Sequence, residues 1–285
     1  MTSGSDLEPF FQGRRYLIAY CPFHEDRGRP NFVLYPKKGI CFRCGAEVGP
    51  EEVASLLRSG SLELAGGGGK GNGKREEAKA LEALFREAYD NLWQGALRPR
   101  QAYLRERGIG TGFAMSRGIG HTGSAFLIPF RDREGRLVGA KLRADPAFGL
   151  SWRYKNWPGT PSLLYRPFPE GSPTVLVEGE LDALLLAQWG IDALSPSTGV
   201  WSLLSLPLPK KRRLFLLLDW DGAGQEVGKR LEREGKGILV ERPEWGEGAK
   251  DIGEALLRLP EERRYDELLA LLHRAALAGF GARKP

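Results

Sequence analysis

Carboxylates follow two short apolar runs of the chain. The run VLVE ends in Glu178, and the run LFLLLD ends in Asp219, with Asp221 two residues further on. Runs of Leu, Val and Phe bounded by glycine-containing turns are typical of strands that are covered on both faces. Because ligands bind at the carboxyl ends of such strands, we expect these three side chains to meet at one edge of a parallel sheet.

Anionic side chains that converge in this way repel one another unless a cation is present. Oxygen-only ligands suit Mg²⁺ or Mn²⁺, which also bind substrate phosphates. Asp182 and Asp251 follow the same kind of apolar run and could join this metal site, and Lys250 could contact a phosphate. Taken singly, the acids have structural alternatives, since Asp182 could cap the following helix and Asp221 could belong to an ordinary turn.

A second set of chemically competent residues lies near the start of the chain. Cys21 and His24 form one pair with two residues between them, and Cys41 and Cys44 form another. Two such pairs can complete a tetrahedron around one Zn²⁺, and a Cys₃His set leaves no open position for catalysis. The spacing therefore predicts one structural zinc ion, which would stabilise a module too small to fold by its own core.

Basic residues gather in the middle of the chain. Between Gly95 and Trp157 there are 12 Lys and Arg residues against 4 Asp and Glu residues, a local net charge of +8, whereas the whole chain has +6. This excess is typical of a surface that binds phosphates, although a solvated Arg-rich surface is the alternative. Aromatic residues interleaved with Arg153 and Lys155 could stack on bases or belong to the core.

The chain must fold into several elements to position these groups. The sequence predicts a helix over 75–93, a hairpin in FLIPFRDREGRLVGAKLRA, and alternating strands and helices from VLVE to GILVERP. The glycine-rich stretch 66–74 predicts a flexible linker without helix or strand. The predicted domains are a zinc ribbon (1–65), the linker (66–74), a basic subdomain (75–172), a subdomain with the acidic strand ends (173–258) and a C-terminal helix (259–285).

Composition excludes some classes of protein. No run approaches eighteen uninterrupted apolar residues, and the N-terminus lacks the basic-then-apolar order of a signal peptide. The three cysteines are odd in number and crowded together, which disfavours a disulfide framework. We therefore expect a cytoplasmic protein with no membrane partner.

The motifs resemble a known family. VEGELDAL and LLDWDGAG resemble the Toprim domain of DnaG-type primases, topoisomerases and certain nucleases, and CPFHEDRGRPNFVLYPKKGICFRCG resembles the zinc ribbon of the primases. The stretches YLRERGI and WRYKNWPGTPSLLY resemble the basic subdomain that precedes Toprim in those primases. The likeness covers residues 17–258 and implies an α/β protein, with a small β zinc ribbon that binds template, a mixed α+β basic subdomain and a catalytic subdomain with a mostly parallel Toprim sheet.

The resemblance also implies an activity, namely synthesis of short RNA primers on single-stranded DNA from ribonucleoside triphosphates, with a replicative helicase as partner. It implies Glu178 as general base or metal-organising group, and two or more Mg²⁺ or Mn²⁺ ions held by aspartates. The metal ligands it implies are Asp219 and Asp221, with Asp182 and Asp251 lining the site. The nucleic-acid and nucleotide contacts it implies are Arg143, Lys155 and Asn156, to which the residue pattern itself adds Arg153 and Lys250.

The sequence departs from the bacterial form of these primases. It reads Glu180-Leu181 where a Tyr-Met pair is frequent, and it ends soon after the Toprim motifs. Both features favour a phage or mobile-element primase without a helicase domain. Two alternatives stay open, a Toprim nuclease and a non-catalytic, zinc-dependent protein that binds single-stranded DNA.

Overall fold

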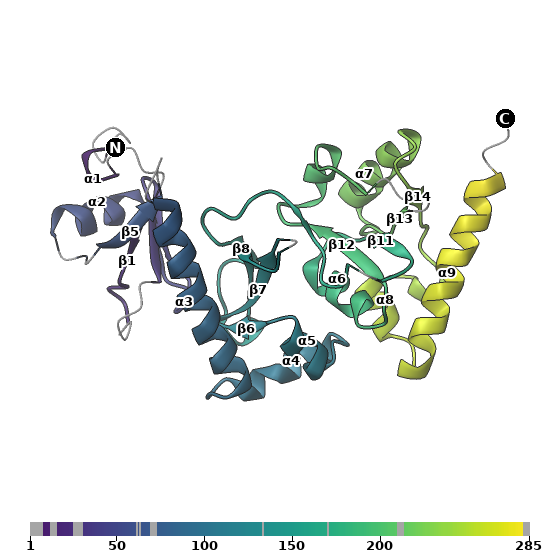
Figure 1. The fold of residues 1–285 in the computed structure, drawn as a ribbon, viewed down its shortest axis with the longest axis horizontal. Helices are drawn as coiled ribbons and strands as arrows, with labels where there is room; N and C mark the ends of the chain where they lie inside the picture. The colour runs from purple at the N-terminus through teal and green to yellow at the C-terminus, as the bar shows by residue number, and fades with distance from the viewer. Residues whose placement is uncertain are drawn as a thin grey trace. The chain divides into compact units, whose positions relative to one another are not determined.

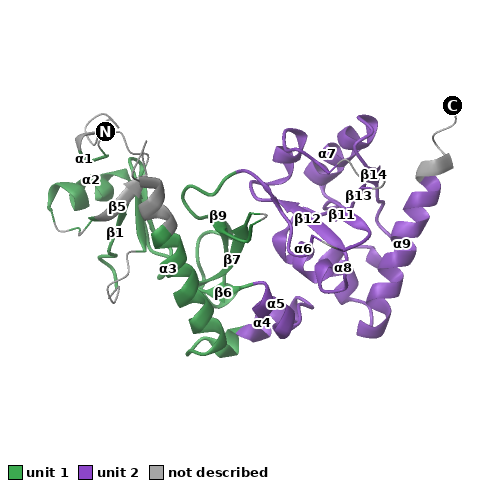
Figure 2. Cartoon of the chain, in the orientation of Figure 1, with its two compact units in different colours: residues 1–100, 118–161 green, residues 101–117, 162–285 purple. Residues whose placement is uncertain are grey.

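The computed structural model describes most of the chain. The described residues are 8–11, 16–24, 31–60, 62, 64–68, 73–132, 134–169, 171–209 and 214–281. They form two compact units, one of residues 1–100 and 118–161 and the other of residues 101–117 and 162–285 (Figure 2). Residues 101–117 and 162–172 belong to the second unit. The domain boundaries at residues 65 and 172 stay a prediction.

The first unit begins with an antiparallel sheet in the order β4-β3-β2-β1-β5. Figure 1 labels β1 and β5 of this sheet. A short helix, α1 (Glu8–Phe11), precedes it, and α2 (Pro50–Arg58) follows β4. Helix α2 starts with proline at its first position, and Glu52 accepts a hydrogen bond from the Gly49 N–H at 3.0 Å. The strands are β1 (Tyr16–Ala19), β2 (Phe32–Tyr35), β3 (Lys38–Cys41), β4 (Glu47–Val48) and β5 (Leu64–Gly68).

The glycine-rich stretch is more regular than the sequence predicts. Gly66, Gly67 and Gly68 lie in β5 and pair with β1, and helix α3 (Gly73–Trp93) begins at Gly73. The prediction that residues 66–74 exclude regular structure is therefore wrong at these positions, and residues 69–72 lie outside the described part of the chain. The reason is that an edge strand is held by backbone hydrogen bonds to its neighbour, which need no side chains.

A second antiparallel sheet of the first unit has the order β6-β7-β8-β9, with β6 (Gly120–His121), β7 (Ala125–Arg131), β8 (Leu137–Ala144) and β9 (Tyr154–Asn156). Strands β7 and β8 pair antiparallel along their length, which confirms the predicted hairpin. In its turn, Asp132 Oδ1 accepts hydrogen bonds from the N–H groups of Glu134 and Arg136. Helix α3 confirms the helix predicted over 75–93.

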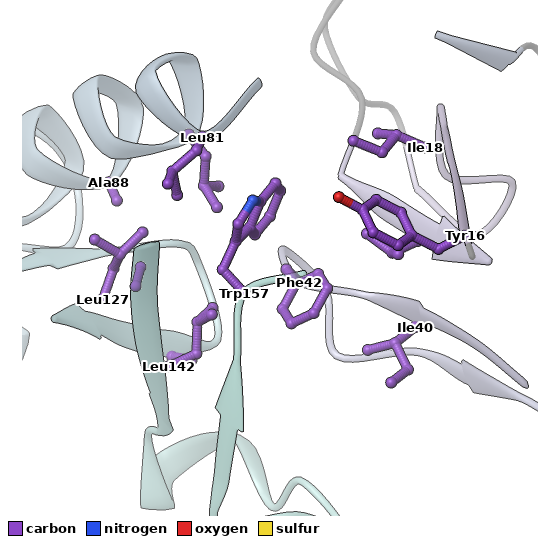
Figure 3. Close-up of a cluster of buried hydrophobic side chains, with 13 residues drawn as sticks. Tyr16, Ile18, Ile40, Phe42, Leu81, Ala88, Leu127, Leu142 and Trp157 are labelled. Atoms are coloured by element: carbon purple, nitrogen blue, oxygen red, sulfur yellow. The ribbon is translucent and has the colours of Figure 1, made fainter. Parts of the chain in front are cut away.

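One apolar cluster joins these elements of the first unit. Trp157, which is 2% exposed, packs beside Phe42 with ring centroids 5.2 Å apart. Figure 3 shows Trp157 at the centre of the cluster, with Phe42, which directly follows β3, on one side and Leu142 of β8 on the other. The same cluster includes Leu81 of α3 and Leu127 of β7, so both sheets and α3 share one core.

The second unit is built on a sheet in the order β10-β12-β11-β13-β14, in which every pair is parallel except β10 with β12. This confirms a mostly parallel sheet. Its strands are β10 (Leu164–Tyr165), β11 (Thr174–Leu176), β12 (Asp192–Pro196), β13 (Leu214–Leu216) and β14 (Ile238–Leu239). Its helices are α4 (Gln101–Glu106), α5 (Thr111–Ser116), α6 (Glu180–Ala187), α7 (Gly222–Arg233), α8 (Ile252–Leu257) and α9 (Glu261–Gly281).

Within the described residues, no helix has the length and apolar character that crossing a membrane requires.

Candidate functional site

The first candidate site is the Cys and His cluster of the first unit. One ligand atom from each of Cys21, His24, Cys41 and Cys44 lies within 4.8 Å of the others. The Sγ atoms of Cys21 and Cys44 are 3.8 Å apart, and Cys41 Sγ lies 3.9 Å from His24 Nδ1. A tetrahedron with Zn–S bonds of about 2.3 Å has an edge of about 3.8 Å, so the spacing fits one zinc ion.

The backbone also prepares these sulfurs as ligands. The Cys41 Sγ accepts from the N–H groups of Arg43 and Cys44, each at 3.4 Å, and Cys21 Sγ accepts from the Phe23 N–H at 3.4 Å. Hydrogen bonding to the Cys21 and Cys44 sulfurs, together with burial, raises the pKa of Cys41 far above its ordinary value. Without a cation the Cys41 thiol therefore keeps its proton, and a zinc ion held by the closed set of four donors would displace that proton.

The second candidate site lies at the carboxyl edge of the parallel sheet. One carboxylate oxygen from each of Asp182, Asp219 and Asp251 lies within 4.8 Å of the others. Asp219 follows β13, Asp182 is in the first turn of α6, and Asp251 is the N-cap of α8. This oxygen-only donor set fits Mg²⁺ or Mn²⁺ rather than a softer metal ion.

The triad is held by contacts between two loops. The Trp220 N–H donates to the carbonyl oxygen of Lys250 at 2.9 Å, which places the residue after Asp219 beside the residue before Asp251. The Lys250 ammonium forms an ion pair with Asp219. Burial, and then the charges of Asp251 and Asp219, raises the pKa of Asp182 well above its ordinary value, which is the expected effect of gathered carboxylates.

Glu178 and Asp221 lie beside the triad and take different roles. The Glu178 Oε1 accepts a hydrogen bond from the Asp219 N–H at 3.1 Å. Burial, and then the Asp219 charge, raises the pKa of Glu178 to about 7. Asp221 is the N-cap of α7, with its Oδ1 accepting from the Gly224 N–H at 3.0 Å. The helix-cap alternative is therefore wrong for Asp182, because the N-cap of α6 is Gly179. Asp221, for which the alternative was an ordinary turn, bonds to nearby backbone as a helix cap.

Three glycines make this packing possible, and none of them was expected from the sequence. A Cβ on Gly224 would lie 2.2 Å from the Asp219 carbonyl oxygen and 2.3 Å from Glu178 Oε1. A Cβ on Gly253 would lie 2.3 Å from Asp182 Oδ1, and one on Gly179 would lie 2.8 Å from Asp182 Oδ2. Gly179 and Gly224 lie in the motifs VEGE and DGAG. The sequence therefore contained these two glycines next to the acidic residues, but it predicted only turns for them.

The predicted nucleic-acid residues of the first unit separate onto two faces of its second sheet. Arg143 of β8 pairs with Tyr154 of β9, and Lys141 pairs with Asn156, so these four side chains share one face. The Arg143 guanidinium lies 4.9 Å from the Tyr154 ring centroid, and Tyr154 is 38% exposed. The Arg153 guanidinium lies 5.6 Å from the same ring, so the exposed Arg153 and the largely buried Arg143 both lie beside an accessible aromatic side chain.

Lys155 is directed to the other face of this sheet. It pairs with Leu142 across the strands and forms an ion pair with Glu47 of β4. Burial, and then the Lys38 charge, lowers the pKa of Lys155 to about 8. Lys155 is thus brought together with the first sheet and not with the basic group around Tyr154.

A buried network that the sequence did not reveal fixes the end of β8. Asp145 accepts a hydrogen bond from Arg100 Nε at 2.6 Å and lies 2.9 Å from His121 Nε2. His121 Nδ1 accepts from the Gly123 N–H at 3.1 Å, so Nε2 carries the proton and donates to Asp145. The network holds the backbone two residues beyond Arg143, and no sequence motif marks it.

Comparison with solved structures identifies proteins that have a similar fold, whereas comparison of sequences does not. No family model and no curated protein matches the sequence. The Aquifex aeolicus primase, in a structure of its zinc-binding and RNA polymerase domains, is 20% identical, with 96% of this chain and 83% of that chain covered and a TM-score of 0.51. The RNA polymerase domain of Mycobacterium tuberculosis primase DnaG, solved with double-stranded DNA, is 18% identical, with 70% and 80% covered and a TM-score of 0.51.

These likenesses show that the chain shares its fold with the zinc-binding and RNA polymerase domains of DnaG-type primases.

Proposed function

We propose that this chain is a DNA primase that joins ribonucleotides into short RNA primers on a single-stranded DNA template. The observation that carries the proposal is that one chain with a primase fold contains two sets of metal-ligating side chains. One set is the Cys₃His cluster and the other is the triad of Asp182, Asp219 and Asp251. A nuclease or a topoisomerase needs the second set but not the first.

The proposed chemistry follows from the acidic site. Asp182, Asp219 and Asp251 would hold divalent cations, and Asp221 and Glu178 add negative charge at the same edge. When bound, two such cations activate the attacking 3′-hydroxyl and neutralise the triphosphate. Glu178 is suited to accept a proton, because a pKa of about 7 leaves about half of it deprotonated at neutral pH.

The basic face of the first unit is proposed to bind the nucleic acid. Arg143 and Arg153 would neutralise phosphates, and Tyr154 would stack on a base. The Cys₃His module would read the template where synthesis starts, as proposed from the sequence. Ribonucleoside triphosphates and a replicative helicase are the further proposed partners, and a phage or mobile-element form of primase is the proposed type.

A primer-synthesis assay tests the proposal. Zinc-loaded protein is incubated with single-stranded DNA, four ribonucleotides and Mg²⁺, and short RNA is the expected product. Asp219→Ala should abolish it, whereas Asp266→Ala, which removes an exposed carboxylate on α9, should not. Shortened DNA without RNA would identify a nuclease instead. If the wild type made neither RNA nor shortened DNA, and Asp219→Ala bound DNA as well as the wild type, the protein would be a non-catalytic binding protein.

A further inference from the structure

Lys250 precedes Asp251 in the chain and lies beside the acidic cluster. Its ammonium forms an ion pair with Asp219 Oδ2. Asp219 is also one of the three aspartates whose oxygens converge within 4.8 Å. The same carboxylate is thus shared between a cation that the chain supplies and the place where a divalent cation would bind.

Hydrogen bonds fix the backbone of Lys250, whereas its half-exposed side chain is free to change conformation. The Lys250 N–H donates to Glu254 Oε2 at 3.0 Å, and its carbonyl oxygen accepts from the Trp220 N–H at 2.9 Å. The Lys250 side chain is 49% exposed, whereas the Asp219 side chain is 10% exposed. A long, half-exposed side chain can release its ammonium to water at little cost, while the carboxylate cannot move away.

The ion pair between Lys250 and Asp219 is surrounded by further carboxylates. Glu178, Asp182, Asp221 and Asp251 all lie close enough to act on the charge of Asp219 or of its neighbours in the cluster. Arg107 is the other cation that acts on Asp182. Carboxylates gathered at this density repel one another strongly, so the cluster is most stable with a positive charge at its centre.

We propose that Lys250 is an exchangeable counter-ion, which neutralises Asp219 until a divalent cation enters the cluster and then moves to a phosphate of the nucleotide that arrives with it. This inference rests on the proposed function, since it requires the acidic cluster to bind a cation. Lys250 is therefore a positioning residue that competes with the metal for Asp219 and afterwards adds affinity for the triphosphate.

Direct measurement of Mn²⁺ binding tests the exchange without relying on activity. Zinc-loaded, full-length protein is titrated with Mn²⁺ alone, by calorimetry or by the electron paramagnetic resonance of free Mn²⁺. Lys250→Met should bind Mn²⁺ about fivefold more tightly than the wild type, the factor expected when a partly exposed ion pair no longer competes. Lys229→Met, which removes an exposed lysine from α7, should bind it as the wild type does.

A second titration, with Mn²⁺-ATP, tests the transfer of the ammonium. Lys250→Met should bind Mn²⁺-ATP several-fold more weakly than the wild type, and Lys250→Arg, which keeps the charge, should restore most of that affinity. Equal or weaker binding of Mn²⁺ alone by Lys250→Met would overturn the exchange. If neither the wild type nor Lys250→Met binds Mn²⁺, or if Asp219→Asn binds it as the wild type does, the metal site itself is overturned together with this role of Lys250.

Discussion

Gly224→Ala should disable the acidic site while leaving the protein folded. The added Cβ would lie 2.2 Å from the carbonyl oxygen of Asp219, where real Cβ contacts are essentially never below 3.0 Å. The start of α7 and the Asp219 backbone must therefore separate by about 0.8 Å, the difference between the two distances. Because that contact is with backbone, no side chain can turn away to relieve it.

The magnitudes separate the effect on stability from the effect on the site. Overpacking costs about 1–3 kcal/mol. Alanine recovers about 1 kcal/mol of helix propensity relative to glycine. The expected net loss in the free energy of unfolding is about 0–2 kcal/mol. A displacement of about 1 Å at a catalytic group costs ~10²-fold in rate, so primer synthesis should fall about 10- to 100-fold.

A neighbouring glycine of the same helix provides the matched control. A Cβ on Gly222 meets nothing within 4 Å, so Gly222→Ala should be neutral or stabilise the protein by up to about 1 kcal/mol, with unchanged activity. Denaturant unfolding, Mn²⁺ titration and the primer assay are run on both variants. If Gly224→Ala matched Gly222→Ala in Mn²⁺ affinity and in activity, the argument that close packing positions Asp219 and Glu178 would be refuted.

Four further perturbations test other parts of the molecule. Cys41→Ser should lose the bound zinc, measured by atomic emission, whereas Ser55→Ala on the exposed face of α2 should keep one Zn²⁺ per chain; equal zinc contents would contradict the Cys₃His site. Trp157→Ala should cost about 3–5 kcal/mol in denaturant unfolding, because it empties the centre of a core shared by two sheets. Trp201→Ala, at a side chain that is 50% exposed, should stay within about 0.5 kcal/mol, and similar losses for both tryptophans would disprove the shared core. Arg143→Ala should weaken binding of single-stranded DNA and reduce its salt dependence by about one phosphate contact, and Tyr154→Ala should cost about 1–3 kcal/mol of binding. The control for both is Arg136→Ala, at a 73%-exposed side chain in the hairpin turn, and the basic face is not the binding surface if Arg136→Ala weakens binding as much. The pKa of Glu178 is raised from 4.5 to about 7 on folding, so its stabilising contribution is complete below pH 4.5 and is lost as the pH rises to 7. In magnesium-free buffer, Glu178→Gln should therefore lose less stability than the wild type between pH 4.5 and pH 7, and parallel pH profiles would show that Glu178 is not perturbed.

The sequence by itself determined the local features of the protein. The two Cys and His pairs converge as their spacing predicts, because two ligands separated by two residues meet within one tight turn. The hairpin of β7 and β8 and the helix α3 also follow their patterns, since alternation and helical periodicity are written into neighbouring residues. The alternation of strands and helices likewise predicts a mostly parallel sheet.

Tertiary structure decided which of the acids meet and which cations lie beside them. Asp219 and Asp221 are two residues apart, so in an extended strand both side chains would point to the same side. In the structure Asp219 joins Asp182 and Asp251, whereas Asp221 caps α7, because the chain turns into the helix after Asp219. Strand register sends Lys155 to the opposite face from Arg143, where it meets Glu47 at a sequence separation of 108. Gly66–Gly68 form a strand because the backbone N–H and C=O groups of β1 pair with them. These outcomes depend on partners far away along the chain, and no local pattern of residues contains that information.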